Sequence, residues 1–341
     1  MRLAIVAEKP SILAAALTSI RESFPDTDLS TVLVCYPVFG WFVGDRRFKL
    51  PRGLRWEDYP FVGSTMFKPI GLEEARCVLG ADRATSRIAT EVEAAESLSK
   101  ADRILLLMDP DYGGLHLAAR FLADHFDVIP WDRTVCPTFF DLLPTSIRQS
   151  MDEAVRGDEK MHLVHAGEIR RYFDYNYLVN SLAVISETAR RVGIEKGVPS
   201  KYGLQLLYDA RQTGEISYSR RIERMARWEG TGKYPRKAAY GLGSPASRAP
   251  IVDQLVKNGY LEIIGKTSTR LSTSGHRFLD ALHPRCEDQD LPFRLAEWSR
   301  LSPANAEEKI ARYIRSFFGR QKTFMAQQPG ERALGLSPAP V

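Results

Sequence analysis

A tyrosine followed by basic residues is the first part of this sequence whose residue types could carry out chemistry. Tyr218 lies in the run Gly-Glu-Ile-Ser-Tyr-Ser-Arg-Arg of residues 214–221, and Arg220 follows it by two positions. A phenol with a pKa of about 10 attacks a phosphodiester only where nearby cations stabilise the charge that develops on the nucleophile and the phosphate. The Arg220 guanidinium could supply that charge and hold a phosphate through two parallel hydrogen bonds. Taken alone, the run favours a surface or half-buried tyrosine in a basic loop.

The tyrosine lies in a segment, residues 201–250, in which basic and aromatic side chains are interleaved. This segment holds ten Lys and Arg against four Asp and Glu, an excess of six, whereas the whole 341-residue chain has a formal net charge of +5. Tyr218, Trp228, Tyr234 and Tyr240 stand among these charges. Such a mixture suits a path for single-stranded nucleic acid, because backbone phosphates and stacked bases are both contacted. A solvated basic face is the other interpretation, and the concentration of charge in one segment favours nucleic acid.

Three carboxylates, Glu8, Asp109 and Asp111, follow two short apolar runs of strand length. If these runs are parallel strands, their carboxyl ends lie at one edge of a sheet, where functional groups collect. Carboxylate oxygens are the ligands that Mg²⁺ prefers, so the three side chains are candidate metal ligands. Asp-Pro-Asp is also good turn chemistry, which leaves a strand-end turn as the alternative. Lys9, beside Glu8, is either a solvated partner of that glutamate or a proton donor or phosphate clamp.

Alternating strand-like and helical runs predict an α/β domain with a parallel sheet in the first part of the chain. The apolar runs at residues 3–7 and 104–108 have the length of strands, and a helical stretch follows each of them. From residue 144 onward the pattern becomes mostly helical. Residues 247–282 indicate a helix, a β-hairpin and a helix, which is a winged-helix-like arrangement. A last helix is expected at about residues 305–320, and the tail after it is rich in Pro, Gly and Ala and is expected to be disordered.

The composition predicts a soluble intracellular protein of two or three domains. The chain is 44% hydrophobic and 26% charged, which is typical of globular proteins and excludes a largely disordered one. Its four cysteines include no Cys-x-x-Cys pair, so neither a zinc ribbon nor a disulfide framework is expected, and a reducing cytoplasm fits. The apolar start of the chain is too short for a signal peptide, and no apolar run approaches the length of a membrane span. We therefore expect cytoplasmic localisation and no membrane partner.

Several motifs occur along the chain in the order found in type IA DNA topoisomerases, and the chain resembles those of the topoisomerase III kind. From first to last, the matching pieces are residues 4–11, 39–41, 108–111, 140–148, 170–174, 178–180, 206–208, 214–220, 243–251, 271–275 and 296–298. The most specific are the tyrosine run that ends at Arg220 and the run Gly-Ser-Pro-Ala-Ser-Arg-Ala-Pro-Ile at residues 243–251. The second run is similar to the family's Gly-Thr-Pro-Ala-Thr-Arg-Ala segment. The resemblance covers the chain from residue 1 to about residue 320.

The resemblance implies an α/β toprim domain with a parallel sheet, followed by mostly α-helical domains that include a winged-helix-like tyrosine domain. The implied order is a toprim domain at residues 1–143, a helical single-strand groove domain at 144–200, the active-site tyrosine domain at 201–283, a C-terminal helical return to the groove domain at 284–321, and a disordered tail at 322–341.

The resemblance also implies an activity, the cleavage and rejoining of single-stranded DNA through a 5′-phosphotyrosyl intermediate. Tyr218 would be the nucleophile and Arg220 would stabilise the developing charge, while Lys9 would protonate the leaving 3′-oxygen and Glu8 would take part in catalysis. A magnesium ion, acting chiefly in rejoining, would be held by Glu8, Asp109 and Asp111. The DNA would be contacted by Arg170, Arg171, Asp174, Asn180, Ser247 and Arg248.

Departures from the family pattern limit this expectation. After Asp111 the chain continues Tyr-Gly-Gly-Leu in place of Arg-Glu-Gly-Glu, so two carboxylates are missing and weaker metal binding is expected. Asp174 and Tyr218 are only 44 residues apart, and Arg220 and Gly243 only 23, whereas relatives carry long insertions in both intervals that build an arch. The chain therefore lacks most of the gate. We expect limited strand passage unless a protein partner or a second copy completes the gate.

Two other functions fit parts of the pattern. The lost carboxylates favour a non-catalytic single-stranded-DNA-binding accessory protein derived from a topoisomerase, which would bind strands without forming a covalent adduct. The presence of Lys9, Tyr218 and Arg220 together argues against it, because binding alone does not need all three. A toprim nuclease or primase is the third possibility, and it leaves the tyrosine run unexplained.

Overall fold

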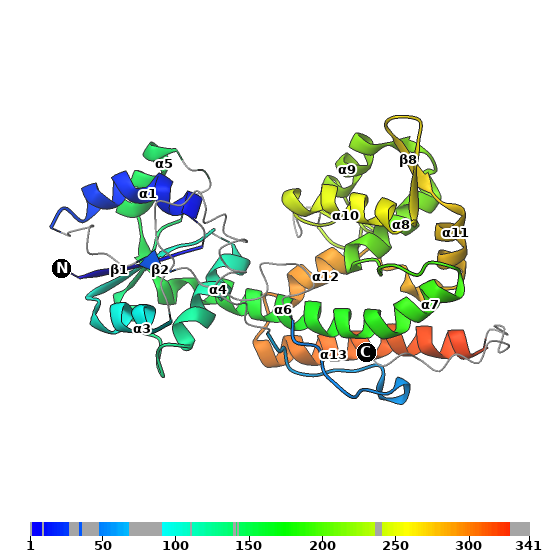
Figure 1. Cartoon of the computed structure of the whole chain (residues 1–341), viewed down its shortest axis with the longest axis horizontal. Coiled ribbons are helices and arrows are strands. Elements are labelled where there is room, and N and C mark those ends of the chain that lie inside the picture. Colours follow the sequence, from blue (N-terminus) through cyan, green and yellow to red (C-terminus); the bar gives the residue numbers. More distant parts are fainter. Residues whose placement is uncertain are drawn as a thin grey trace. The chain divides into compact units, whose positions relative to one another are not determined.

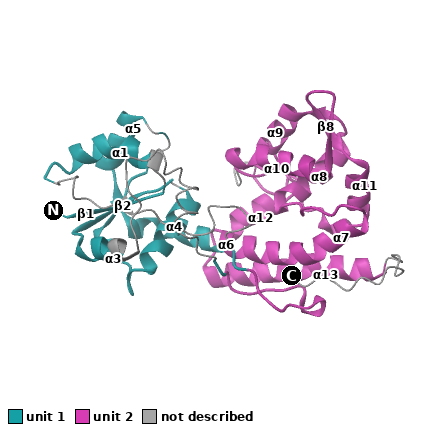
Figure 2. Ribbon diagram, in the orientation of Figure 1, with its two compact units in different colours: residues 1–49, 66–169 teal, residues 50–65, 170–341 magenta. Residues whose placement is uncertain are grey.

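The chain folds into two compact units (Figures 1 and 2). The computed structural model describes residues 2–8, 10–26, 34–35, 48–67, 91–109, 111–138, 141, 143–235 and 241–327. Unit 1 consists of residues 1–49 and 66–169, and unit 2 of residues 50–65 and 170–341. The division falls within one long helix, α6 (Met161–Asn180).

Unit 1 is built on a five-stranded sheet with the strand order β2-β1-β3-β4-β5. The strands are β1 (Leu3–Ala7), β2 (Val34–Cys35), β3 (Arg103–Leu107), β4 (Thr134–Cys136) and β5 (Val155–Arg156). Strands β1 to β4 pair in parallel, and β5 pairs antiparallel with β4. Strand β1 and most of β3 are continuous buried apolar runs, as strands covered on both faces require. The expected parallel sheet is confirmed, with one antiparallel strand added at its edge.

Helices cover both faces of this sheet, because alternate strand residues point to opposite sides. The helices of unit 1 are α1 (Pro10–Ser23), α3 (Glu91–Lys100), α4 (Tyr112–Ala123), α5 (Pro144–Asp152) and the first part of α6, with short 3-10 turns at Trp131–Arg133 and Gly157–Lys160. Leu3, Ile5 and Ala7 pack with α1 and α5 on one face (Figure 1). Ala4 and Val6 pack with α3 and α4 on the other face. The period-two pattern of β1 thus divides its side chains between two cores.

Unit 2 is mostly helical and carries one small antiparallel sheet. Besides the rest of α6, its helices are a π-helical turn Ser181–Ile185, α7 (Ser186–Arg191), α8 (Lys201–Thr213), α9 (Tyr218–Ala226), α10 (Pro245–Lys257), α11 (Thr273–Asp280), α12 (Leu291–Trp298) and α13 (Pro303–Gln327), with 3-10 turns at Trp56–Asp58 and Pro284–Cys286. The sheet has the order β6-β8-β7, formed by β6 (Ile216–Ser217), β7 (Leu261–Ile264) and β8 (Ser268–Leu271). Helix α10, the β7–β8 hairpin and α11 confirm the helix–hairpin–helix order expected over residues 247–282. No helix in the described ranges is long and apolar enough to cross a membrane.

An aromatic cluster joins α6 to α13, which run beside each other in Figure 1. The ring of Tyr177 lies 5.3 Å from that of Phe318 and 5.9 Å from that of Phe317, measured between ring centroids. Phe173, one helical turn before Tyr177 and on the same face of α6, lies 5.8 Å from Tyr313. These contacts fix in unit 2 the part of α6 that carries most of the predicted DNA contacts.

Helix α13 is longer than the sequence predicts. The sequence predicts an end near residue 320 and disorder from residue 322, but the helix continues to Gln327. The Lys322 ammonium donates hydrogen bonds to the carbonyl oxygens of Trp56 at 2.6 Å and Tyr59 at 2.7 Å, and it lies over the Trp56 ring. This contact with a distant segment ties down the last turns of the helix, and local composition gives no sign of it. Residues 328–341 lie outside the described residues.

Candidate active site

Tyr218 is the first residue of α9 and directly follows strand β6. Its N–H donates to the carbonyl oxygen of Thr267, in the turn between β7 and β8, at 2.7 Å. Ser217, the residue before it, is the helix N-cap, and its hydroxyl accepts the N–H of Arg220 at 3.3 Å. Strand pairing and capping together hold the backbone at Tyr218, whose side chain is half-buried.

The Tyr218 hydroxyl contacts helix α10. Its Oη donates to Oδ1 of Asp253 at 2.8 Å, and the carbonyl oxygen of Ala249 lies 3.3 Å from it. Burial, the hydrogen bond to Asp253 and the negative charge of that carboxylate raise the pKa of Tyr218 to about 12. The phenol is therefore protonated at neutral pH and already bonded to a proton acceptor. The sequence analysis missed Asp253, because a single carboxylate on the exposed side of an amphipathic helix gives no local signal.

Arg220 does not share the surroundings of the Tyr218 hydroxyl. Its side chain lines a pocket of about 440 Å³ together with Arg224, Arg227 and Trp228, and Tyr218 does not line this pocket. The reason is geometric, since helical residues two positions apart point to different sides of the helix. The spacing of two residues in the sequence predicts the guanidinium beside the phenol. In this structure the side chain that meets the phenolic oxygen is a carboxylate.

A cluster of cations surrounds Asp174 at the junction of α6 and α8. The Asp174 carboxylate accepts a hydrogen bond from the Lys201 ammonium and lies 3.3 Å from the Arg171 guanidinium. All three side chains are mostly buried. Burial lowers the pKa of Lys201, and the carboxylate of Asp174 opposes that shift. Asp174, predicted to contact DNA, thus holds two cations in place, and with Arg170 the cluster has three positive charges against one negative.

The start of α10 lies next to this cluster. Arg170 donates to the hydroxyl of Tyr202 at 3.3 Å and to Oγ of Ser299 at 3.0 Å. A Cβ atom on Gly243, whose φ is +84°, would lie 3.7 Å from the Tyr202 ring, and Arg248 donates to the Gly243 carbonyl oxygen at 3.2 Å. Tyr202, which bonds to Arg170, therefore lies close to the turn at Gly243, to which Arg248 is bonded.

Ser247 lies in the first turn of α10, and its hydroxyl donates to the Ser244 carbonyl oxygen at 3.0 Å. The N–H groups at the start of a helix favour anions, so the predicted contacts Arg170, Ser247 and Arg248 belong to a region that suits a phosphate.

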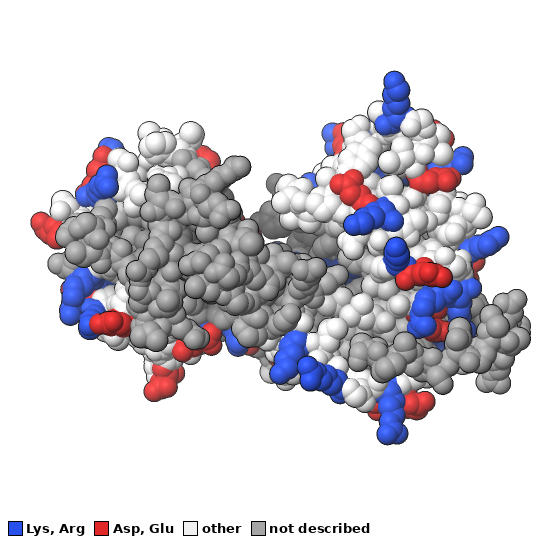
Figure 3. Space-filling view, in the orientation of Figure 1, with Lys and Arg blue, Asp and Glu red and all other residues white. Residues whose placement is uncertain are grey.

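Elsewhere in unit 2 several basic residues are paired with acids. On the face drawn in Figure 3, Lys and Arg are interspersed with Asp and Glu. Arg224 is paired with Asp209 at 2.6 Å and Arg227 with Glu223 at 2.8 Å. Two of the described cations of residues 201–250 are thus already neutralised by neighbouring acids. The cluster around Asp174 together with the start of α10 is the better candidate for a nucleic-acid contact.

Asn180 has a structural role in place of the expected DNA contact. It is fully buried, its Oδ1 accepts the N–H of Phe61 at 2.8 Å, and its Nδ2 donates to the Phe61 carbonyl oxygen at 2.7 Å. Asn176, one turn earlier, makes the same pair of bonds with Gly63 at 2.8 and 3.0 Å. Two asparagines four residues apart on α6 thus bind two peptide groups two residues apart on an extended segment, and so join residues 50–65 to unit 2. An amide bonded on both sides and buried in this way does not face a groove.

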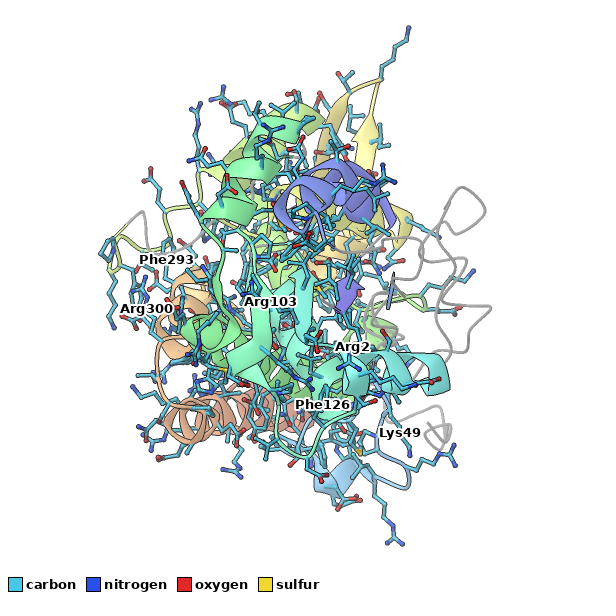
Figure 4. All side chains as sticks on the ribbon, turned by 90° about the vertical axis from the view of Figure 1, so that its left-hand side faces the viewer. Arg2, Lys49, Arg103, Phe126, Phe293 and Arg300 are labelled. Carbon is cyan, nitrogen blue, oxygen red and sulfur yellow. The ribbon has the colours of Figure 1, made fainter. Side chains whose placement is uncertain are left out.

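In unit 1, Glu8 and Asp109 meet at the carboxyl ends of β1 and β3. Oε2 of Glu8 accepts the N–H of Asp109 at 2.9 Å, and the N–H of Glu8 donates to the Leu107 carbonyl oxygen at 2.9 Å. The amino ends of the same strands carry Arg2 and Arg103, which Figure 4 labels. The expected meeting of the two strand ends is confirmed. Metal binding by these carboxylates stays a prediction.

The Asp111 carboxylate caps the start of helix α4. Its Oδ1 accepts the N–H groups of Gly113 at 2.8 Å and Gly114 at 2.9 Å, which makes it the N-cap of that helix. A Cβ atom on Gly114 would lie 2.9 Å from Oε2 of Glu8, so the glycine allows a close approach of helix and carboxylate. Within the described part of the chain, no three His, Cys, Asp or Glu side chains form a group that could hold a metal ion. The three predicted ligands therefore do not form one complete metal site.

Lys9, the predicted proton donor, lies outside the described residues, as do residues 39–41 of the resemblance. The carboxylates belong to unit 1 and the tyrosine to unit 2, so each group is described within its own unit.

Comparison with known proteins gives no family for the chain. No protein-family model matches it. No curated protein matches it either. The resemblance to type IA topoisomerases therefore depends on the motifs, their order and the contacts described above.

Proposed function

We propose that this chain cleaves and rejoins single-stranded DNA through a 5′-phosphotyrosyl link on Tyr218, as a shortened enzyme of the type IA topoisomerase kind. One observation carries the proposal. The tyrosine run and the Gly-Ser-Pro-Ala-Ser-Arg run are separate in the sequence, yet the Tyr218 hydroxyl contacts α10 at Ala249, the residue after Arg248. The segment to which the resemblance assigns the nucleophile and a segment to which it assigns DNA contacts are thus neighbours within unit 2.

The cations near Asp174 support single-stranded DNA as the substrate. Arg170, Arg171, Lys201 and Arg248 are four basic side chains against the one carboxylate of Asp174, and Tyr202 adds an aromatic ring 4.9 Å from the Lys201 ammonium. Phosphate contacts of this kind position a strand without reading its sequence. In this proposal the sheet of unit 1 is a toprim domain, and α10, β7, β8 and α11 form a winged-helix-like domain.

The proposed reaction is a transesterification. The Tyr218 oxygen attacks a phosphorus atom, the bond from phosphorus to the 3′-oxygen breaks, and the 3′-oxygen takes up a proton, for which we propose Lys9 as the donor. Rejoining is the reverse reaction. Arg220 takes part only if its side chain leaves the pocket that it lines with Arg224.

Magnesium, when bound, would supply charge stabilisation at the phosphate during rejoining. Glu8 and Asp109 are its proposed ligands, with weak affinity, because Asp111 is occupied as a helix cap. The donor set does not complete a site, and we assign no step to the metal. The short intervals before and after Tyr218 limit strand passage, so efficient passage requires a protein partner or a second copy.

A non-catalytic single-strand-binding protein is the second candidate function. The incomplete carboxylate group and the raised pKa of Tyr218, about 12, favour it, because both weaken the chemistry. Such a protein binds single strands through the same cations and forms no adduct.

The experiment that tests the proposal uses an end-labelled single-stranded oligonucleotide, with magnesium in one arm and EDTA in the other. We expect a denaturation-resistant protein–DNA adduct in both arms, because cleavage is not assigned to a metal. Tyr218→Phe is expected to abolish the adduct. Tyr234→Phe, the same change at a tyrosine that stacks on Phe293, is the matched control and is expected to keep it. An adduct that survives in Tyr218→Phe excludes Tyr218 as the nucleophile, and no adduct in the unaltered protein favours the binding protein.

A further inference from the structure

We propose that Asp253 is the general base that takes the phenolic proton of Tyr218 as its oxygen attacks the phosphate. This inference rests on the proposed function and assigns to it a residue that the sequence motifs do not include. Asp253 lies on α10, 35 residues after the tyrosine.

The geometry already matches that of a nucleophile and its base. Oη of Tyr218 is 2.8 Å from Oδ1 of Asp253, within the distance that direct proton transfer needs. Both residues stand on helices, and the backbone of Tyr218 is fixed by Thr267 and by the Ser217 cap. The acceptor and the donor are therefore held by rigid elements and not by loops.

Asp253 is the acceptor that takes up a proton. The hydroxyl meets two acceptors, the Asp253 carboxylate and the Ala249 carbonyl oxygen at 3.3 Å. A peptide carbonyl is far too weak a base to keep a proton, so it serves to orient the hydroxyl. Asp253 is exposed, which lets it pass the proton on to water.

A base is needed because free phenolate is scarce. With the pKa of Tyr218 at about 12, only ~10⁻⁵ of the phenol is ionised at pH 7. Attack by a phenolate formed beforehand is therefore rare. Removal of the proton during the attack avoids that limit, and the Arg220 guanidinium lines a separate pocket and accepts no proton.

In the cleavage step, the proton transfer to Asp253 accompanies the transfer of the phosphate from the 3′-oxygen to Tyr218. The bond from Tyr218 Oη to hydrogen breaks, the proton moves to Oδ1 of Asp253, and the phenolic oxygen forms a bond to phosphorus. The bond from phosphorus to the 3′-oxygen breaks, its electron pair stays on that oxygen, and the oxygen takes a proton from Lys9, the donor proposed above. In rejoining, the 3′-hydroxyl gives its proton back to neutral Lys9 as its oxygen attacks the phosphorus, and Asp253, which takes up a proton again from water, gives that proton to the departing tyrosine oxygen. No oxidant or reductant is required.

The test is the single-turnover rate of adduct formation on a single-stranded oligonucleotide. We expect Asp253→Ala and Asp253→Asn to slow the reaction by about 10²-fold or more, the usual contribution of a general base. Added formate is expected to restore part of the rate to Asp253→Ala, and sodium chloride at the same ionic strength is not. Asp280→Ala removes an exposed carboxylate, paired with Arg211, from the same unit and is the matched control with an unchanged rate.

The outcomes separate the two proposals. If the unaltered protein forms no adduct, the proposed function and the role of Asp253 both fall. If it forms an adduct that needs Tyr218, and Asp253→Ala reacts at a similar rate or gains nothing from formate, only the general base is refuted. Asp253→Asn keeps the size of the side chain, and its thermal unfolding midpoint and its binding of single-stranded DNA distinguish lost chemistry from lost folding.

Discussion

Replacing Asp253 by Asn should make the Tyr218 phenol more acidic. The carboxylate contributes to the raised pKa of about 12 through its hydrogen bond and its charge, and burial contributes the rest as the largest cause. Two unit charges 2.8 Å apart interact by roughly 1.5 kcal/mol even with the dielectric constant of bulk water. That energy equals about one pKa unit, so the variant should titrate near pH 11.

Ultraviolet absorbance of tyrosinate measures this change. The chain has 13 tyrosines, so Tyr218 is isolated as the difference between each protein and the same protein with Tyr218→Phe added. At pH 11, ~10% of Tyr218 should be ionised in the unaltered protein and ~50% in Asp253→Asn. Asp280→Asn, which removes a carboxylate far from the phenol in sequence, should leave the Tyr218 pKa at about 12.

Two results would refute this reasoning. A Tyr218 that titrates near pH 10 in the unaltered protein would mean that the phenol is neither buried nor bonded to a carboxylate. An equal pKa in the protein and in Asp253→Asn would mean that burial alone raises it. Either result removes the contact on which the assignment of Asp253 depends.

The remaining predictions concern stability and DNA binding in unit 2. Asn180→Ala leaves the N–H and carbonyl groups of Phe61 without their partners, so we expect a free energy of unfolding lower by about 1–3 kcal/mol, measured by urea denaturation. The control Asn305→Ala, at an exposed asparagine, should change this free energy little. Equal stability of the two variants would contradict the role of Asn180. Arg248→Ala should weaken single-stranded DNA binding. It should also reduce the slope of log affinity against log salt by about 0.7, because one phosphate contact is lost. The control Arg312→Ala, at an exposed arginine, should keep the slope of the unaltered protein. An unchanged slope in Arg248→Ala would place the strand elsewhere.

Features that depend on local pattern could be predicted from the sequence. The apolar run of β1 and the one at β3 are each long enough for a strand, and parallel pairing then brings Glu8 to Asp109. The helix, hairpin and helix of residues 247–282 were visible because Gly and β-branched residues mark their boundaries. The sequence also predicts the order of these elements along the chain, with the parallel sheet first and the helix–hairpin–helix segment after it.

Features that depend on distant contacts could not be predicted. The resemblance of residues 178–180 to a family motif implies that Asn180 contacts DNA, but its partner in the structure, Phe61, lies 119 residues earlier. The role of Lys322 depends on Trp56, 266 residues away. In each case a polar side chain satisfies the peptide groups of a segment that has no regular strand partner, and nothing in the neighbouring sequence identifies that segment.

The pairing of Tyr218 with Asp253 follows from the short connection between α9 and α10. Only residues 227–244 separate the two helices, and near the end of this connection the N–H of Leu242 donates to the Met225 carbonyl oxygen, at the end of α9, at 2.8 Å. Gly241 has a φ of +85°, and a Cβ atom there would lie 2.4 Å from that same oxygen, so the return requires glycine. In this chain the residues before α10 are bonded to the end of α9, and the Tyr218 hydroxyl donates to Asp253 on α10, so the contact that we propose for catalysis lies between two helices joined by a short connection.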